Sequence, residues 1–169
     1  MVAFTYRMGG GIAGDVNRTH PASIEPNVND TTNPATFYGQ AVVYSSTGTV
    51  RTVLPTDTAL TAINGITVRP FPVQQGTTNQ DFGSSQIGAA GIGPANALDI
   101  LNWGYMTVTV NGSPVKGGTV YVWIAASTGS HVQGGFEASP TSGSTIQLSN
   151  AYFNSQADAS GNVEVAFNI

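Results

Sequence analysis

The fold predicted for this sequence depends on the stretch from Trp103 to Ala126, which contains WGYMTVTV (103–110), NGSPVKGG (111–118) and TVYVWIA (119–125). The first and third segments alternate between two kinds of residue, as strands do, because successive side chains on a strand point to opposite faces. We therefore predict two strands joined by a glycine-containing connector, forming a central hairpin.

One face of the two predicted strands is purely aliphatic, and it consists of Met106, Val108, Val110, Val120, Val122 and Ile124. A fully buried side chain of this size contributes roughly 1.5–3 kcal/mol, so we assign this face to the core. The other face mixes threonine with aromatic rings, namely Tyr105, Thr107, Thr109, Thr119, Tyr121 and Trp123. We expect the function of the protein to involve this second face.

Composition indicates a β-rich protein with unusually few charges. At 169 residues, the chain is long enough for one domain with a core. Charged residues make up 8% of it, whereas a typical soluble domain has about 25%. Because charge is depleted at the cores of interfaces, this composition fits a surface that lies largely against partners, and it fits an ordinary secreted β domain equally well. The 21 glycines and 9 prolines favour many short strands over long helices.

The same totals argue against several classes of partner. The net charge is −4, and Lys116 is the only lysine or arginine after Arg69, so we expect no direct binding of nucleic acid. Without cysteine the chain has neither a disulfide nor a thiolate metal site. No apolar run approaches the length of a membrane span, and MVAFTYRMGGG lacks the apolar segment of a signal peptide. We therefore expect no membrane partner.

We divide the chain into an extended N-terminal arm at residues 1–35 and a β domain at residues 36–169. Glycines and prolines in the arm discourage regular strand pairing. Asp15, Arg18, His20 and Glu25 give it mixed charges at intervals, which suits a segment that lies across a partner by strand addition. A disordered terminus is the alternative interpretation.

Strand signals begin at Thr36 and recur about every ten residues. The predicted strands are 38–45, 49–54, 60–68 with a tight turn at Asn64-Gly65, 145–148, 151–153 and 162–169. We predict a rigid connection or edge segment at 69–74, long loops at 77–96 and 127–144, and a short helical turn within 94–102. This spacing predicts an all-β fold, either a β-sandwich or a jelly-roll-like barrel, with long loops.

No cluster of residues has the pattern of a catalytic, metal or cofactor site. His20 and His131 have only Asp15 and Glu137 near them in sequence, which is not the spacing of a zinc site. No serine lies in a recognisable nucleophile turn, which argues against a Ser-His-Asp triad. Residues 158–164 weakly resemble a calcium loop, but a Ser-Gly-Asn hairpin turn explains them better. We therefore predict that the protein is not an enzyme.

Two interpretations remain for the face that carries Tyr105, Tyr121 and Trp123. Aromatic rings beside hydroxyl groups can stack on sugars, and the same residues are enriched at contacts between subunits. Recognition of sugar hydroxyls needs several convergent polar groups, and this face has few carboxylates or amides. We therefore favour a subunit contact over a carbohydrate-binding module.

Five groups of residues give the chain a resemblance to a known family. They are Met8-Gly9-Gly10 with Gly14 to Arg18 and Ile24-Glu25-Pro26, then Gly65 to Pro72, Asp99-Ile100-Leu101 with Gly104-Tyr105-Met106, Lys116 to Val122, and Ala157 to Gly161 with Ala166 to Ile169. In this order and spacing they resemble the structural cement, or head decoration, proteins of tailed bacteriophages over nearly the whole length. Similar proteins often have a basic residue where this chain has Asn102-Trp103, so a shell contact there would be apolar.

The resemblance implies a non-enzymatic protein that binds the outside of an icosahedral head and ties major capsid protein subunits together. It places the protein on the outer surface of the virion after synthesis in the host cytoplasm, with no cofactor. We favour a homotrimer over a dimer. A carbohydrate-binding β-sandwich on the virion, for adhesion to the host surface, is the alternative.

Two sets of contact residues follow as hypotheses. We expect the capsid to be contacted by Asp15, Arg18, His20, Glu25 and Arg69. We expect a neighbouring subunit to be contacted by Tyr105, Tyr121 and Trp123.

Overall fold

The computed structural model describes residues 11–58, 63–70 and 92–169, and these ranges contain strands but no helix. The strands are β1 (Ser23–Val28), β2 (Ala41–Tyr44), β3 (Val50–Thr52), β4 (Gly65–Val68), β5 (Ala97–Asn111), β6 (Thr119–Trp123), β7 (Phe136–Glu137), β8 (Thr145–Phe153) and β9 (Asn162–Phe167). The predicted all-β class is therefore confirmed. Within the described ranges, no helix is long and apolar enough to cross a membrane.

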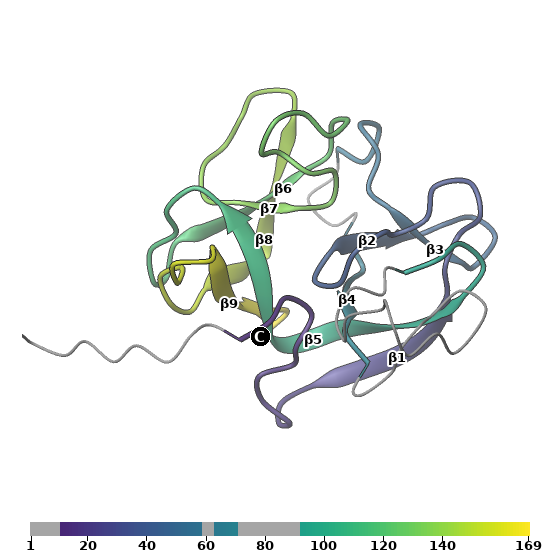
Figure 1. The fold of residues 1–169 in the computed structure, drawn as a ribbon, viewed down its shortest axis with the longest axis horizontal. Helices are drawn as coiled ribbons and strands as arrows, with labels where there is room; N and C mark the ends of the chain where they lie inside the picture. Colours follow the sequence, from purple (N-terminus) through teal and green to yellow (C-terminus); the bar gives the residue numbers. More distant parts are fainter. Residues whose placement is uncertain (1–10, 59–62, 71–91) are drawn as a thin grey trace, which may run out of the picture.

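Strand β5 belongs to two sheets at once, and the fold is organised around it (Figure 1). Its C-terminal half closes a barrel in the order β5-β7-β6-β8-β9 and back to β5. Its N-terminal half lies in a second sheet, in the order β1-β5-β4-β2-β3. The result is a closed β-barrel with extra strands attached to it.

Gly104 marks the change of sheet along β5. Its φ is 141°, and a β-carbon at this position would lie 3.0 Å from the carbonyl oxygen of Pro21 and 3.2 Å from the α-carbon of Ala22. Glycine is needed here because the chain that leads into β1 passes directly against β5.

The barrel interior is the aliphatic face that alternation predicts. Met106, Val108 and Val110 of β5 point inward, and none of them is more than 5% exposed. They pack with Val120, Val122, Ile124, Phe136, Phe153 and Phe167 in one core cluster. A small closed barrel is filled by its own side chains, so these residues form the core rather than a channel.

The predicted central hairpin is wrong, because β5 and β6 do not pair with each other. The short strand β7 lies between them, parallel to β5 through Val110↔Phe136 and antiparallel to β6 through Val122↔Phe136. The strand lies inside 127–144, which the sequence predicts as a loop. Two residues are too few for alternation to be visible, and this explains why the sequence predicts the wrong neighbour for both long strands.

Three local predictions also need correction. The chain from 97 to 102 is strand rather than a helical turn, and β8 is one strand with a register shift rather than two. Gly65 opens β4 rather than completing a tight turn. A β-carbon on Gly65 would lie 3.0 Å from the carbonyl oxygen of Leu101. The absence of a side chain at Gly65 therefore lets β4 approach β5 closely.

The predicted Ser-Gly-Asn turn is present between β8 and β9. Asp158 Oδ1 accepts hydrogen bonds from the backbone N–H groups of Ser160 at 2.8 Å and Asn162 at 2.9 Å. In the part of the chain that the structure describes, no three histidine, aspartate or glutamate side chains are placed to hold a metal. Residues 71–74 of the predicted rigid segment and 77–91 of the predicted loop lie outside the described residues.

Candidate interaction surface

The chain from Gly14 to Asn17 lies along β5 and pairs with it. Gly14 N–H donates to the carbonyl of Thr107 at 2.8 Å, and Thr107 N–H donates to the carbonyl of Asp15 at 2.9 Å. Asn17 N–H donates to the carbonyl of Tyr105 at 2.9 Å. The sequence predicts that this segment adds as a strand to a partner. In the structure, the segment adds to β5 of its own chain. The division of the chain at residue 35 stays a prediction.

A polar cluster holds the end of this segment to β9. Arg18 Nη2 lies 2.7 Å from Glu164 Oε1, and the guanidinium carbon of Arg18 lies 3.8 Å from the centre of the Tyr105 ring. Asn17 donates to Glu164 Oε2 at 2.9 Å, and Asn154 donates to Oε1. Burial works to raise the pKa of Glu164, but the two amides and Arg18 outweigh it and hold that pKa below its usual value.

A second ion pair ties the segment to the end of β4. Arg69 Nη1 lies 3.9 Å from Asp15 Oδ1, and Arg69 N–H donates to the carbonyl of Gly14 at 2.8 Å. Three of the predicted capsid contacts, Asp15, Arg18 and Arg69, are therefore engaged within the chain. The other two, His20 and Glu25, are exposed, although Glu25 Oε2 accepts a hydrogen bond from the Tyr44 hydroxyl at 3.0 Å.

Strand β1 presents an apolar row at the edge of the second sheet. Ile24 is 45% exposed, Val28 is 49% exposed, and the exposed Pro26 lies between them on the same face. Proline lacks the backbone N–H and is tolerated in an edge strand. Ser23 of β1 pairs with Trp103, which is itself 41% exposed. The sequence does not predict this row. Ile24, Pro26 and Val28 are seen to share one face only when residues 23–28 are known to form a strand.

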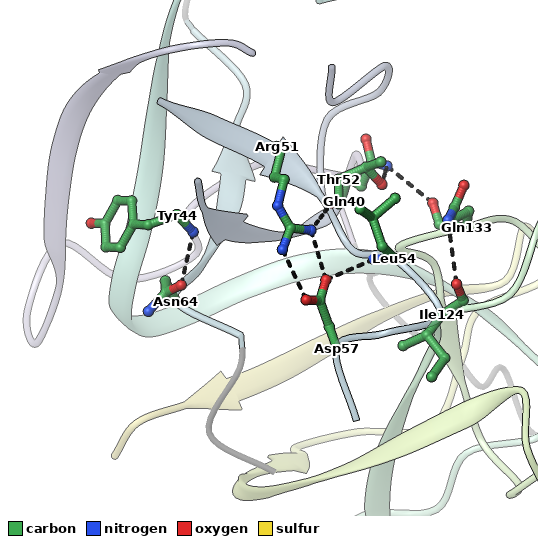
Figure 2. A network of polar contacts seen from close by, with 9 residues as sticks. All are labelled: Gln40, Tyr44, Arg51, Thr52, Leu54, Asp57, Asn64, Ile124 and Gln133. Atoms are coloured by element: carbon green, nitrogen blue, oxygen red, sulfur yellow. Dashed lines mark hydrogen bonds and ion pairs between the residues drawn. The ribbon is translucent and has the colours of Figure 1, made fainter. Parts of the chain in front are cut away.

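Gln40 joins the second sheet to the barrel (Figure 2). Its buried amide donates to Thr52 Oγ1 at 2.7 Å and to the carbonyl of Gln133 at 3.0 Å. The Gln133 side chain donates to the carbonyl of Ile124 at 3.3 Å. Ala41 N–H also donates across this boundary, to the carbonyl of Gly134 at 2.9 Å. We call this line of contacts between Gln40–Ala41 and Gln133–Gly134 the seam.

A two-pronged ion pair lies in the same region of the second sheet (Figure 2). Arg51 Nη1 donates to Asp57 Oδ2 at 2.7 Å, and Arg51 Nη2 donates to Asp57 Oδ1 at 2.8 Å. Leu54 N–H donates to the same carboxylate at 2.7 Å. The hydrogen bond from Arg51 is the main reason that the pKa of Asp57 lies below its usual value. The pair therefore fixes the loop that follows β3.

His131 and Glu137 meet beside Trp123, although their spacing in the sequence does not predict a zinc site. Glu137 is 4% exposed, and its carboxylate binds His131 Nδ1 at 2.9 Å and the amide of Asn111 at 2.9 Å. The rings of Trp123 and His131 are stacked, with centroids 4.1 Å apart and planes 16° apart. Trp123 Nε1 donates to the carbonyl of Ala126 at 3.2 Å.

The three predicted subunit-contact residues differ in how much of each side chain is exposed. Trp123 is only 5% exposed and its ring is stacked against His131, whereas Tyr105 and Tyr121 are half-buried. The hypothesis stays a prediction, and Tyr105 and Tyr121 present more surface for such a contact than Trp123 does.

A cleft of about 480 Å³ opens next to the His131–Glu137 pair. Most of its wall is apolar, and it is lined by Phe37, Thr109, Val110, Asn111, Ser130, Val132, Gly135, Phe136 and Glu137. Phe37 comes from the chain before β2, and the other residues come from the barrel and its loops. The cleft therefore lies where the two sheets meet.

Comparison with protein families identifies the class of the protein. Residues 2–168 match the family described as structural cement protein (E217 gp24/Pam3 gp6). The chain therefore belongs to this family of phage structural cement proteins, and the resemblance noted from the sequence is confirmed. Membership makes it a structural component of a phage virion.

Solved structures add a likeness in fold. A chain in the structure titled "The capsid of Myoviridae Phage XM1" superposes with a TM-score of 0.69 and 20% sequence identity. The superposition covers 98% of this chain and 95% of that chain, so the two share the whole fold. Comparison with curated proteins gives no match.

Proposed function

We propose that the protein binds the outer surface of a phage head and bridges major capsid protein subunits, so that it stabilises the shell. The observation that carries this proposal is the match of residues 2–168 to structural cement proteins. The chain of similar fold, which comes from a phage capsid structure, supports it. Each bridge can be weak, because many copies act in parallel and a protein that touches several subunits gains by multivalency.

The N-terminal segment is the proposed capsid-binding element. The ion pairs of Asp15 with Arg69 and of Arg18 with Glu164 hold the segment in place. His20 and Glu25 then supply polar contacts, and the exposed apolar row of β1 supplies buried area. Edge strands with exposed apolar side chains are unusual unless a partner covers them, which supports this assignment.

The remaining parts of the proposal rest on the family. We propose a non-catalytic homotrimer, which reaches the outer surface of the virion after synthesis in the host cytoplasm. Tyr105 and Tyr121 are the proposed subunit contacts. The carbohydrate-binding alternative is not favoured, since Arg18 covers the Tyr105 ring and His131 covers the Trp123 ring.

Co-sedimentation with phage heads tests the proposal. Purified protein is mixed with expanded, undecorated heads, and unexpanded heads serve as the comparison. We expect saturable binding to expanded heads, with a fixed number of copies per head at the plateau. Absence of binding to both kinds of head would contradict the proposal. Light scattering of the free protein tests the trimer, which requires three times the 17.4 kDa of one chain.

A further inference from the structure

The cleft beside Glu137 has the form of a binding site. Its volume of about 480 Å³ falls in the range of roughly 300–1,000 Å³ that is usual for sites holding compact ligands. Phe37, Val110 and Phe136 supply apolar walls, and Val132, 44% exposed, stands among the lining residues. A concave apolar site of this size can accept a large side chain together with its neighbours.

The walls of the cleft are fixed by the seam. Phe37 N–H donates to Gln40 Oε1 at 3.4 Å, and the carbonyl of Phe37 accepts from Thr67 Oγ1 at 2.9 Å. On the opposite side, Gly134 precedes the lining residue Gly135 and lies against the Gln40 side chain. A preformed site binds without the cost of ordering its own walls.

The charge of the cleft selects for a cationic partner. Among the lining residues that the structure describes, Glu137 carries the only carboxylate, and none is lysine or arginine. Its two oxygens bind His131 and Asn111, and each carboxylate oxygen can accept a further hydrogen bond. A lysine or arginine at the mouth of the cleft would therefore find a buried anion already held in position.

We propose that this cleft is a socket for the major capsid protein, in which one large apolar side chain fills the apolar walls and an adjacent lysine or arginine pairs with Glu137. The inference rests on the proposed function, because it takes the capsid as the partner. It adds a second contact on the barrel, separate from the apolar row of β1.

The test compares two exposed valines. Val132→Lys places a cation among the walls of the cleft, where it repels the proposed lysine or arginine, while Val115→Lys makes the same change at a valine that is 59% exposed and outside the cleft. Both variants should keep the thermal midpoint of the wild type. We expect Val132→Lys to weaken binding to expanded heads at least tenfold, and Val115→Lys to bind as the wild type does.

The possible outcomes separate the socket from the proposed function. Equal binding of Val132→Lys and the wild type would overturn the socket and leave the capsid role intact, whereas failure of the wild type to bind would overturn the capsid role itself. A change in the mass of the free protein caused only by Val132→Lys would assign the cleft to a second copy of the chain and overturn the capsid partner.

The cationic part of the proposal has its own variant. Glu137→Gln removes the negative charge at nearly constant size, and Asp99→Asn removes one elsewhere. We expect Glu137→Gln to lower the affinity for heads and to weaken its dependence on salt, because one ion pair is lost. If both variants bind with the salt dependence of the wild type, the cationic partner is wrong.

Discussion

Gln40 and Gly134 lie so close together that a β-carbon on Gly134 would be 2.7 Å from Gln40 Cγ and 2.8 Å from Gln40 Nε2. This contact, with the hydrogen bond from Gln40 to the carbonyl of Gln133, joins the second sheet to the barrel. The proposed bridge between capsid subunits would carry tension, so under that proposal the joint between the second sheet and the barrel has to resist separation.

The first prediction concerns the space at Gly134. Gly134→Ala should destabilise the protein by about 2–5 kcal/mol, because the methyl group strains a positive φ and forces Gln40 away. Gly117→Ala is the matched control, since Gly117 has φ of 77° against 78° for Gly134 and nothing within 4 Å of its β-carbon. Chemical denaturation measures both variants. Equal losses would mean that backbone strain alone matters and that the contact with Gln40 does not.

The second prediction concerns the amide of Gln40. Gln40→Leu leaves the hydroxyl of Thr52, the carbonyl of Gln133 and the N–H of Thr36 without this partner. A buried polar group without a partner costs about 1–3 kcal/mol, so a loss of several kcal/mol is expected by urea denaturation. Gln147→Leu, at an exposed position of β8, should change stability by less than about 0.5 kcal/mol. A loss no larger than that of Gln147→Leu would contradict the role of the seam.

The third prediction concerns stability in acid. The pKa of Asp57 is lower in the folded chain than its unfolded value of about 3.9, so its ion pair stabilises the fold above that value. This stabilisation is lost as the pH falls through the folded pKa. Asp57→Asn should therefore be less stable than the wild type at pH 7, and the difference should shrink below about pH 4. A difference that stays constant from pH 7 to pH 3, measured in urea, would refute this assignment.

The fourth prediction concerns the attachment of the N-terminal segment. Arg18→Ala removes the ion pair with Glu164 and the contact with the Tyr105 ring, which together contribute about 1–2 kcal/mol at most. Hydrogen exchange of the amides of Gly14 and Asn17 should become up to roughly tenfold faster, while the barrel core keeps its protection. Lys116→Ala, in the connector before β6, should leave these rates unchanged, and similar effects of the two variants would contradict the prediction.

The fifth prediction concerns the apolar row of β1. Ile24→Asp should weaken binding to expanded heads about tenfold or more, because it places a charge in the proposed contact. Ile169→Asp is the matched control, since Ile169 is 50% exposed against 45% for Ile24. Co-sedimentation measures both, and equal binding of the two variants would remove β1 from the proposed capsid contact.

Several features of the fold could be read from short stretches of sequence. The inward face of β5 and β6 follows from alternation, and the turn at Asp158 follows from its own residues, because both depend on neighbours along the chain. The exposure of the aromatic residues does not follow from alternation. Alternation places Trp123 on the outer side of the barrel, but in the structure its ring is buried and stacked against His131, a contact that alternation does not predict.

Alternation and ordered motifs are properties of the chain, so the all-β class, the aliphatic core face and the family can be predicted from the residues. Three relationships are visible only in the folded chain: β7 separates β5 from β6, Gln40 reaches Gly134, and Glu137 meets Asn111 beside a cleft. These relationships join residues far apart in sequence or depend on a strand of two residues. Local periodicity carries no information about them, because pairing between distant strands is settled only when the whole barrel closes.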